Sequence, residues 1–167
     1  MSSQSSLTRA LISEEGVYGL ILVSGLIAAS GGGGAPAGRT LIFVGVTVIV
    51  FWVAHVYAGS VARHGTPSAS GETVGIRAAI RASARKSRGM LVSVLPPGAA
   101  LLLGVFGVVA DGTAKWIALW VCVAVLAVLG FIAYRRKGAS VPICLLGALS
   151  TASFGFVIIV VKAVVTH

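Results

Sequence analysis

The chain has 167 residues, of which 57% are hydrophobic and 10% are charged, and its mean hydropathy is +1.01. Soluble domains carry charge on about a quarter of their residues, so this composition excludes an ordinary water-soluble domain. The formal net charge is +9, from 13 Lys and Arg against 4 Asp and Glu. Long uncharged runs occupy 16–38, 40–62, 89–110, 116–134 and 138–161. They leave no room for a soluble catalytic domain, so we expect that the protein is not an enzyme.

The runs predict an all-α polytopic membrane bundle that forms a single domain over residues 1–167, because a membrane span needs about 20 apolar residues. We expect spans at about 14–30, 40–62, 90–110, 114–134 and 140–164. Ser13 is a suitable N-cap for the first span, and the glycine-rich stretch 31–36 ends it. The second run is rich in β-branched residues, but lipid does not tolerate an open strand edge, so a helix is predicted there as well.

A basic stretch at about 72–88 precedes the third span. Four arginines recur there at helical spacing, which predicts a short interfacial helix that binds anionic lipid headgroups. They are Arg77, Arg81, Arg85 and Arg88. Nucleic-acid binding is not expected, because no aromatic or base-reading residues lie between them.

The third span contains Pro96 and Pro97, which remove backbone donors, so we expect the helix to kink or break there. The carbonyls that they free belong to residues 92 and 93, and the Ser93 hydroxyl is a candidate partner.

The basic residues of the connections predict the orientation. One side holds ten of them: Arg9, Arg63, Arg77, Arg81, Arg85, Lys86, Arg88, Arg135, Arg136 and Lys137. The other side holds Arg39 and Lys115. The positive-inside rule then puts the N-terminus in the cytoplasm and the C-terminus outside.

His55 lies inside the second span, where an ionisable residue is costly and usually faces the bundle interior. Trp52 precedes it by three residues and shares its helical face. Glu15, Tyr18 and Tyr57 are expected at overlapping depths, because the first two spans are antiparallel neighbours joined by a short loop. The cluster is interpreted either as a proton or ion relay or as a hydrogen-bonded group that locks two helices.

Haem or metal ligation by His55 is a weaker alternative, because no second His or Cys stands at ligand spacing within a span. Cys122 and Cys144 form no C-x-x-C pair and are expected to behave as small buried hydrophobes. We therefore expect neither a metal nor another cofactor.

Lys162 shares a helical face with Gly147, Thr151 and Gly155, a small-residue stripe that favours close helix packing. This face predicts that Lys162 points to the packed side, where it can pair with Asp111. The alternatives are a lysine that reaches the headgroups and a charge that attracts anions or substrate at the outer surface.

The first span is also rich in small residues, including Gly16, Gly19, Ser24 and Gly25. They predict close packing, within the chain or at a subunit interface. Because five short helices enclose little volume, a transport protein of this size is expected to act as a homo-oligomer.

The strings 15–19 (EGVYG) and 51–58 (FWVAHVYA), with the ending from Gly155 to Lys162, resemble a family of small, uncharacterised integral membrane proteins of actinobacteria. The resemblance covers all five expected spans and implies a bacterial plasma membrane. It implies no activity.

Two functions remain open. The first is a small ion- or proton-linked channel or transporter. The second is a membrane scaffold or accessory subunit that binds partners or anionic lipid through its basic helix.

Overall fold

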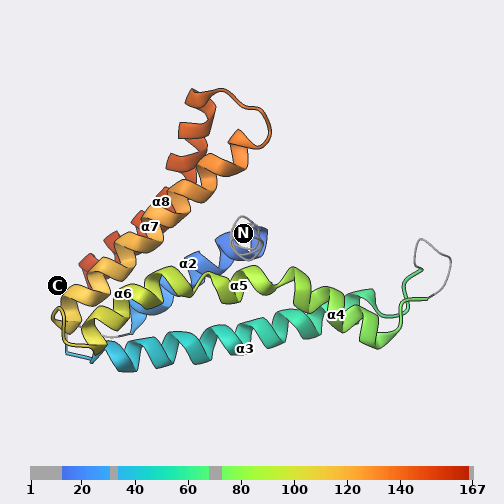
Figure 1. The fold of residues 1–167 in the computed structure, drawn as a ribbon, viewed down its shortest axis with the longest axis horizontal. Helices are drawn as coiled ribbons and strands as arrows, with labels where there is room; N and C mark the ends of the chain where they lie inside the picture. The colour runs from blue at the N-terminus through green and yellow to red at the C-terminus, as the bar shows by residue number, and fades with distance from the viewer. Residues whose placement is uncertain (1–12, 31–33, 68–72, 166–167) are drawn as a thin grey trace.

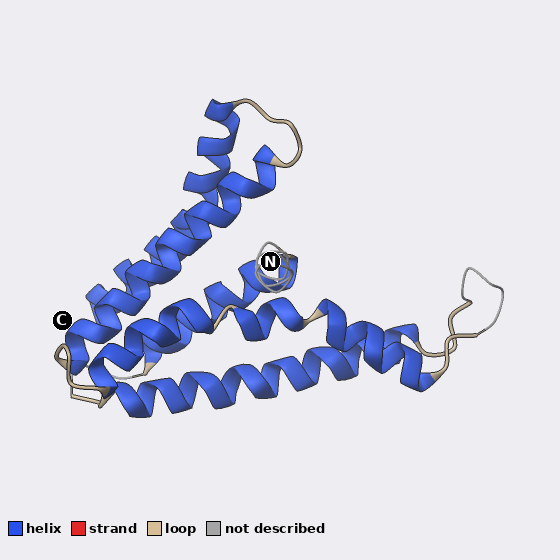
Figure 2. Ribbon diagram, in the orientation of Figure 1, coloured by secondary structure: helices blue, strands red, loops and turns tan. Residues whose placement is uncertain are grey.

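The computed structural model describes residues 13–30, 34–67 and 73–165, and the regular structure within them is helical (Figure 1). The helices are α2 (Glu14–Ala29), α3 (Ala37–Arg63), α4 (Ile76–Lys86), α5 (Arg88–Val92), α6 (Leu95–Val105), α7 (Asp111–Arg135) and α8 (Val141–Val165). An isolated antiparallel bridge joins Pro67 and Thr73 in the α3–α4 connection, and no strand is drawn in the described part of the chain (Figure 2). The predicted all-α class is confirmed.

Three of the helices are long and apolar enough to cross a membrane, namely α3, α7 and α8. A fourth crossing results if residues 76–92 and α6, which meet at a bend of 43°, count as one span. Helix α2 has 16 residues, or about 24 Å at 1.5 Å per residue, which is short for a span. Helix length thus supports a membrane protein, but it does not confirm five spans.

The third predicted span differs from the structure in where it breaks and where it ends. The interruption lies at Ser93 and Val94, ahead of the two prolines, which occupy the first turn of α6. Proline is tolerated in a first turn because its missing N–H has no helical acceptor there. The Ser93 hydroxyl donates to Met90 O at 2.7 Å instead of serving the carbonyls of residues 92 and 93. Helix α6 ends at Val105, so residues 106–110 are not helical.

The basic stretch expected at 72–88 forms α4, which begins at Ile76 and ends at Lys86. It runs antiparallel along the C-terminal part of α3, and α5 and α6 continue in the same direction (Figure 1). Because Ser87 alone separates α4 from α5, the basic helix extends the third segment.

Helix α2 lies at the centre of the packing, against α3, α5, α7 and α8. Leu20, Val23 and Ile27 of α2 are fully buried, as are Met90 of α5 and Leu119 of α7. The α7–α8 hairpin contacts α6 and α2 at one end and diverges from the other helices towards its own turn (Figure 1). The short α2 is therefore enclosed by its neighbours, of which α3, α7 and α8 are longer than it is.

Glycines bring the helix backbones together. A Cβ on Gly19 would lie 2.9 Å from Met90 Cα, and a Cβ on Gly130 would meet the Gly147 carbonyl. Gly147 lies under the Tyr134 ring, and Gly155 packs on Val123 and Leu126. These contacts confirm the close packing expected of both small-residue faces, but the partner is another helix of the same chain. Gly19, Gly147 and Gly155 are thus not left free for a subunit interface, whereas nothing lies within 4 Å of a Cβ at Gly25 of α2.

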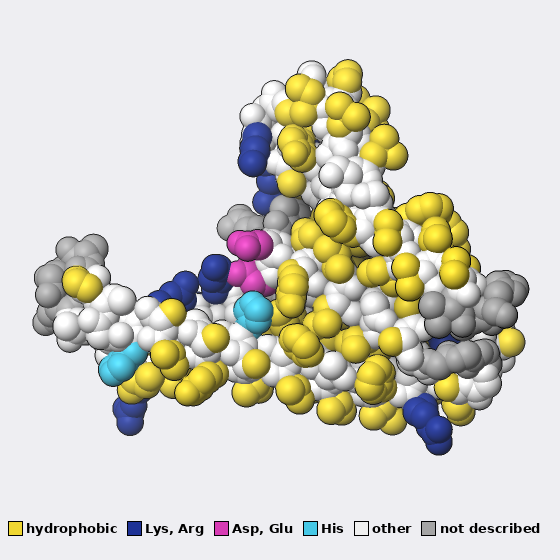
Figure 3. Space-filling view, turned by 180° about the vertical axis from the view of Figure 1, so that it is seen from behind, with side chains coloured by type: hydrophobic (Ala, Val, Ile, Leu, Met, Phe, Trp, Pro, Cys, Tyr) yellow, Lys and Arg dark blue, Asp and Glu magenta, His cyan; other side chains and the backbone are white. Residues whose placement is uncertain are grey.

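Large apolar side chains remain exposed along the outer faces of α3 and α8, as Ile42 and Leu149 illustrate, each 68% exposed (Figure 3). Trp116, Trp120 and Tyr134 are also part-exposed, near the two ends of α7. Such a surface suits contact with lipid chains and an aromatic belt at each interface.

Gly130→Ala is expected to lower the free energy of unfolding by about 1–3 kcal/mol, because its methyl group would push α8 off α7. The measurement is the thermal midpoint in detergent, followed by circular dichroism. Gly45→Ala is the matched control, because nothing lies within 4 Å of a Cβ at that position of α3. Equal midpoints for the two variants would contradict the packing described for α7 and α8.

Candidate functional site

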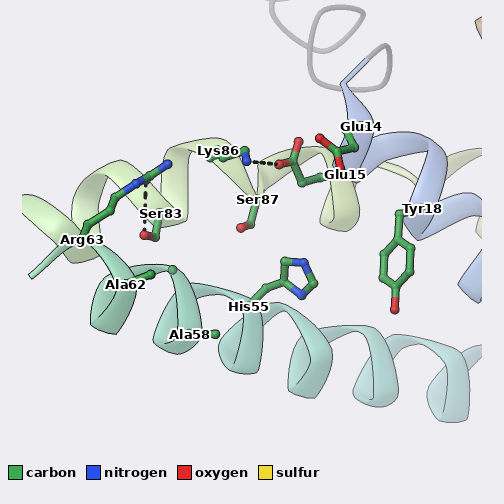
Figure 4. A pocket seen from close by; sticks show the side chains of 11 residues that line it. Glu14, Glu15, Tyr18, His55, Ala58, Ala62, Arg63, Ser83, Lys86 and Ser87 are labelled. Atoms are coloured by element: carbon green, nitrogen blue, oxygen red, sulfur yellow. Dashed lines mark hydrogen bonds and ion pairs between the residues drawn. The ribbon is translucent and has the colours of Figure 1, made fainter.

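A cavity of about 700 Å³ lies where α2 begins, between its first turns, the C-terminal part of α3 and α4 (Figure 4). Its lining residues are Glu14, Glu15, Tyr18, His55, Ala58, Gly59, Ala62, Arg63, Ser83, Lys86 and Ser87. The volume is in the range of small-molecule sites. The cavity thus gathers polar side chains from three helices of a mainly apolar protein.

The first turn of α2 brings two carboxylates to this cavity. Ser13 caps the helix, since Gly16 N donates to its Oγ at 3.1 Å, and Glu14 and Glu15 follow at the positive end of the helix dipole. Glu15 is 8% exposed and forms an ion pair with Lys86 of α4, at 3.3 Å between Oε1 and Nζ. Because the Lys86 side chain is 58% exposed, this pair joins a buried carboxylate to a solvated ammonium group.

Helices α3 and α4 approach closely at Gly59, where a Cβ would lie 2.8 Å from Ser83 Oγ. One turn further along α3, Arg63 Nη1 donates to the same Ser83 oxygen at 3.4 Å. Gly59 therefore leaves room for the Ser83 side chain and lets α4 lie close to α3. That approach places Lys86 within reach of Glu15.

His55 and Tyr18 face each other across the cavity from α3 and α2 (Figure 4), with ring centroids 5.8 Å apart and planes inclined by 35°. His55 lies two turns before Arg63, which is about 12 Å along the helix. The structure thus brings together Glu15, Tyr18 and His55, three of the four residues whose depths were expected to overlap.

Two other residues of the predicted cluster lie elsewhere. Tyr57 is 72% exposed and does not line the cavity, because it lies two residues from His55 and so on a different face of α3. Trp52 packs against the apolar core, and its Nε1 is buried without an acceptor among the described residues. A buried donor of this kind costs about 1–3 kcal/mol unless water or another ligand accepts its hydrogen bond.

Sequence reasoning missed Ser83, Lys86 and Ser87, which line the cavity from α4. The signal was present, because these residues and the buried Ala79 recur at intervals of three and four. They form a second face on the helix, opposite the arginine stripe. Lys86 was predicted only as one basic residue of the connection, so the direction of its side chain, away from the arginine stripe, was not predicted.

The arginine stripe itself is exposed. Arg77, Arg81, Arg85 and Arg88 are all exposed, and Arg88 Nε donates to Arg85 O at 3.3 Å. The opposite face of α4, with Ala79 and Ser83, is buried against α3. The stripe is therefore available to anionic groups outside the protein.

The opposite end of the bundle carries Asp111, Lys115 and Lys162. Asp111 Oδ1 accepts a hydrogen bond from Ala37 N at 2.8 Å, and Lys115 Nζ donates to Ala35 O at 2.7 Å. Lys162 is 8% exposed, and its Nζ lies 5.6 Å from the centre of the Trp116 ring. Lys162 thus points to the packed side as predicted, where it lies over Trp116, and its pairing with Asp111 stays a prediction.

Within the described residues, no three His, Cys, Asp or Glu side chains come together in a way that could hold a metal ion. Cys122 and Cys144 are free and buried in α7 and α8.

Comparison of the chain with protein-family models, with curated proteins and with solved structures finds no match in any of the three. The resemblance to actinobacterial membrane proteins therefore stays a prediction.

The Lys86–Glu15 pair predicts unequal effects of its two single substitutions. Lys86→Met is expected to destabilise the protein more than Glu15→Gln, because it leaves a buried carboxylate without its partner. The coupling energy from the double-mutant cycle should be at most about 1 kcal/mol, because Lys86 is largely solvated.

The cycle is measured by chemical or thermal unfolding in detergent, with Arg85→Met, on the exposed stripe of the same helix, as the control. A Lys86→Met variant as stable as Arg85→Met would contradict the ion pair.

Proposed function

We propose that the chain is an integral membrane protein of the bacterial plasma membrane that transfers a proton or small ion and performs no catalysis. The cavity between α2, α3 and α4 would be its ionisable entrance. The observation that carries this proposal is the buried, ion-paired Glu15 beside the Tyr18–His55 pair. In a chain with 4 Asp and Glu in all, two of them line this one cavity.

The charges of the cavity support an ion-handling role. Glu14 and Glu15 are offset by Arg63 and Lys86, so the permanent charges of the lining sum to zero. His55 adds an imidazole, a side chain that proton relays commonly use, to this lining.

Trp52 supports a continuation of the proton or ion path from His55 deeper into the bundle. It lies one turn deeper on the same face of α3, and its Nε1 is a buried donor without an acceptor among the described residues. Water that enters from the cavity would supply that acceptor. In this proposal Tyr18 positions the His55 ring, and Tyr57 has no part in the path.

The proposed topology has five crossings, made by α2, α3, the bent α4–α6 segment, α7 and α8, with the N-terminus in the cytoplasm and the C-terminus outside. The clustering of Lys and Arg over α4 and near the α7–α8 turn supports this orientation (Figure 3). The burial of α2 among the longer α3, α7 and α8 supports counting it as a crossing, because these neighbours screen a short helix from lipid.

A homo-oligomer remains part of the proposal, but its contacts differ from those expected. Gly19, Gly147 and Gly155 are already packed within the chain, so the subunits would meet through the exposed apolar faces of α3 or α8.

Flux measurements in proteoliposomes test the transport proposal. A pH-sensitive dye is enclosed, and gradients of H⁺, K⁺, Na⁺ and Cl⁻ are imposed in turn. We expect flux in the wild type and its loss, at least tenfold, in His55→Ala. His64→Ala is the matched control, because His64 is exposed beyond the end of α3 and does not line the cavity.

Flux in His55→Ala equal to that of the wild type would remove His55 from the path. The absence of flux under every gradient, with a folded protein, would overturn the transport proposal and favour the second candidate.

The second candidate is a scaffold or accessory subunit that binds anionic lipid through α4. Its support is the exposure of all four stripe arginines on the face away from α3. It predicts that anionic phospholipid in mixed micelles raises the thermal midpoint, and that Arg77→Gln with Arg81→Gln removes most of this rise. A rise unchanged by these substitutions would reject the stripe as the lipid site.

A further inference from the structure

We propose that the cavity between α2, α3 and α4 binds a small zwitterion, a molecule in which a primary ammonium group and a phosphate or carboxylate group are a few bonds apart. The inference rests on the proposed function in one respect, because it takes this cavity as the entrance to the protein, and it adds the class of ligand that the entrance receives. Free solutes of the amino-acid kind and the phosphoethanolamine headgroup of a lipid share this chemistry.

The size of the cavity is the first observation. Its volume is about 700 Å³, whereas a water molecule occupies about 30 Å³ of the liquid. The space is therefore much larger than a single ion with a few water molecules needs. Pockets of this volume are typical of sites for small organic molecules. The cavity thus has room for a ligand of several non-hydrogen atoms together with water.

Two permanent charges of the lining have no counter-charge of their own. Glu15 and Lys86 form an ion pair at 3.3 Å, but neither Glu14 nor Arg63 forms an ion pair with a described residue. Glu14 lies in the first turn of α2 and Arg63 in the last turn of α3, and Figure 4 shows them at opposite ends of the lining. One negative and one positive charge therefore remain for a ligand, at separate places.

The end of the cavity at Arg63 fits an anionic group. Arg63 Nη1 donates to Ser83 Oγ at 3.4 Å, which is a long contact with a neutral partner. Ser87 is 4% exposed, its hydroxyl forms no hydrogen bond with a described residue, and it points from α4 towards α3 (Figure 4). A polar group on a buried residue is costly without a partner, and a ligand oxygen would supply one. Because a guanidinium group also binds phosphate and carboxylate oxygens well, this end suits an anion.

The end of the cavity at Glu14 fits an ammonium group. Glu14 precedes Tyr18 by four residues, so the two lie on one face of α2. Tyr18 and His55 face each other across the cavity, with ring centroids 5.8 Å apart, and both side chains are exposed. A carboxylate accepts the hydrogen bonds that an ammonium group donates, and the face of a tyrosine ring attracts a cation. Glu14 and Tyr18 therefore offer both kinds of contact to the same group.

A ligand with both charges fits this lining better than a simple ion does. The permanent charges of the lining sum to zero, so a simple cation or anion would leave a net charge in a mainly apolar protein. A zwitterion leaves the sum unchanged and meets Glu14 and Arg63 at once. The path proposed from His55 into the bundle would then start beside the bound ligand.

The first test is the thermal midpoint of the purified full-length chain in dodecyl maltoside, an uncharged detergent. The zwitterionic probes are glycerophosphoethanolamine and γ-aminobutyrate, and the single-charge probes are ethanolamine, butyrate and dimethyl phosphate. A ligand of the folded state raises the midpoint in proportion to its affinity and concentration. We expect a zwitterion to raise the midpoint saturably, at a concentration at least tenfold lower than any single-charge probe. A single-charge probe that acts at the same concentration as the zwitterions would overturn the site.

Substitutions locate the binding. Glu14→Gln and Arg63→Gln should each weaken the apparent affinity for the zwitterion at least tenfold, because each removes one charge-assisted contact. Arg85→Gln is the matched control, because it removes an exposed charge of α4 that does not line the cavity. Glu14 is exposed in a first turn, so Glu14→Gln serves if Arg63→Gln does not fold. The same affinity in Glu14→Gln as in Arg85→Gln would overturn the site.

Phosphatidylethanolamine in mixed micelles separates the two sources of the ligand. If the headgroup is the ligand, this lipid raises the midpoint and removes the response to the free zwitterions, while phosphatidylglycerol does neither. If the ligand is a free solute, the lipid leaves that response unchanged. A midpoint that responds to none of the three zwitterions would overturn the site. Because no readout here uses flux, binding in a chain that moves no ion would reject the ion path alone, and flux without binding would reject the zwitterion site alone.

Discussion

Close approach of helix backbones at glycine is the constraint on which the rest of this structure depends. In lipid, apolar side chains gain little by packing on one another rather than on acyl chains, so helices associate where small residues let them come near. Gly19 joins α2 to α5, Gly59 joins α3 to α4, Gly104 joins α6 to α3 and α7, and Gly130 joins α7 to α8. Each junction has a backbone or short side chain where a Cβ would otherwise stand.

The polar groups lie where these junctions place them. The contact at Gly59 brings α4 near enough for Lys86 to reach Glu15, and the contact at Gly104 sets the start of α7 against the start of α3. At that second place Asp111 caps Ala37 N, and Lys115 bonds to the chain just before α3. The two charged clusters therefore sit at opposite ends of α3, with the apolar core between them.

The sequence could predict most of the helices, because length and lack of charge are properties of each segment alone. The α3, α7 and α8 helices match three predicted spans to within about three residues at each end. The meeting of Glu15, Tyr18 and His55 could also be predicted, since it follows from depth in two adjacent helices. The break in the third segment was misplaced because proline starts a helix as readily as it interrupts one. The partners of Lys86 and Lys115 could not be predicted, because they depend on which faces of non-adjacent helices meet.

The difference in length between α2 and α3, 16 against 27 residues, has a consequence for how related chains would diverge. The cavity begins where α2 begins, so its extent is governed by helix length more than by the bulk of the side chains around it. One added turn at the start of α2 would advance that helix by about 5.4 Å along α3 towards Arg63. Insertions and deletions of three or four residues directly after Ser13 would therefore resize the cavity and leave the lining from α3 and α4 intact. Homologues with different ligands would then differ first by alignment gaps at this point, before they differ by substitutions at His55 or Lys86.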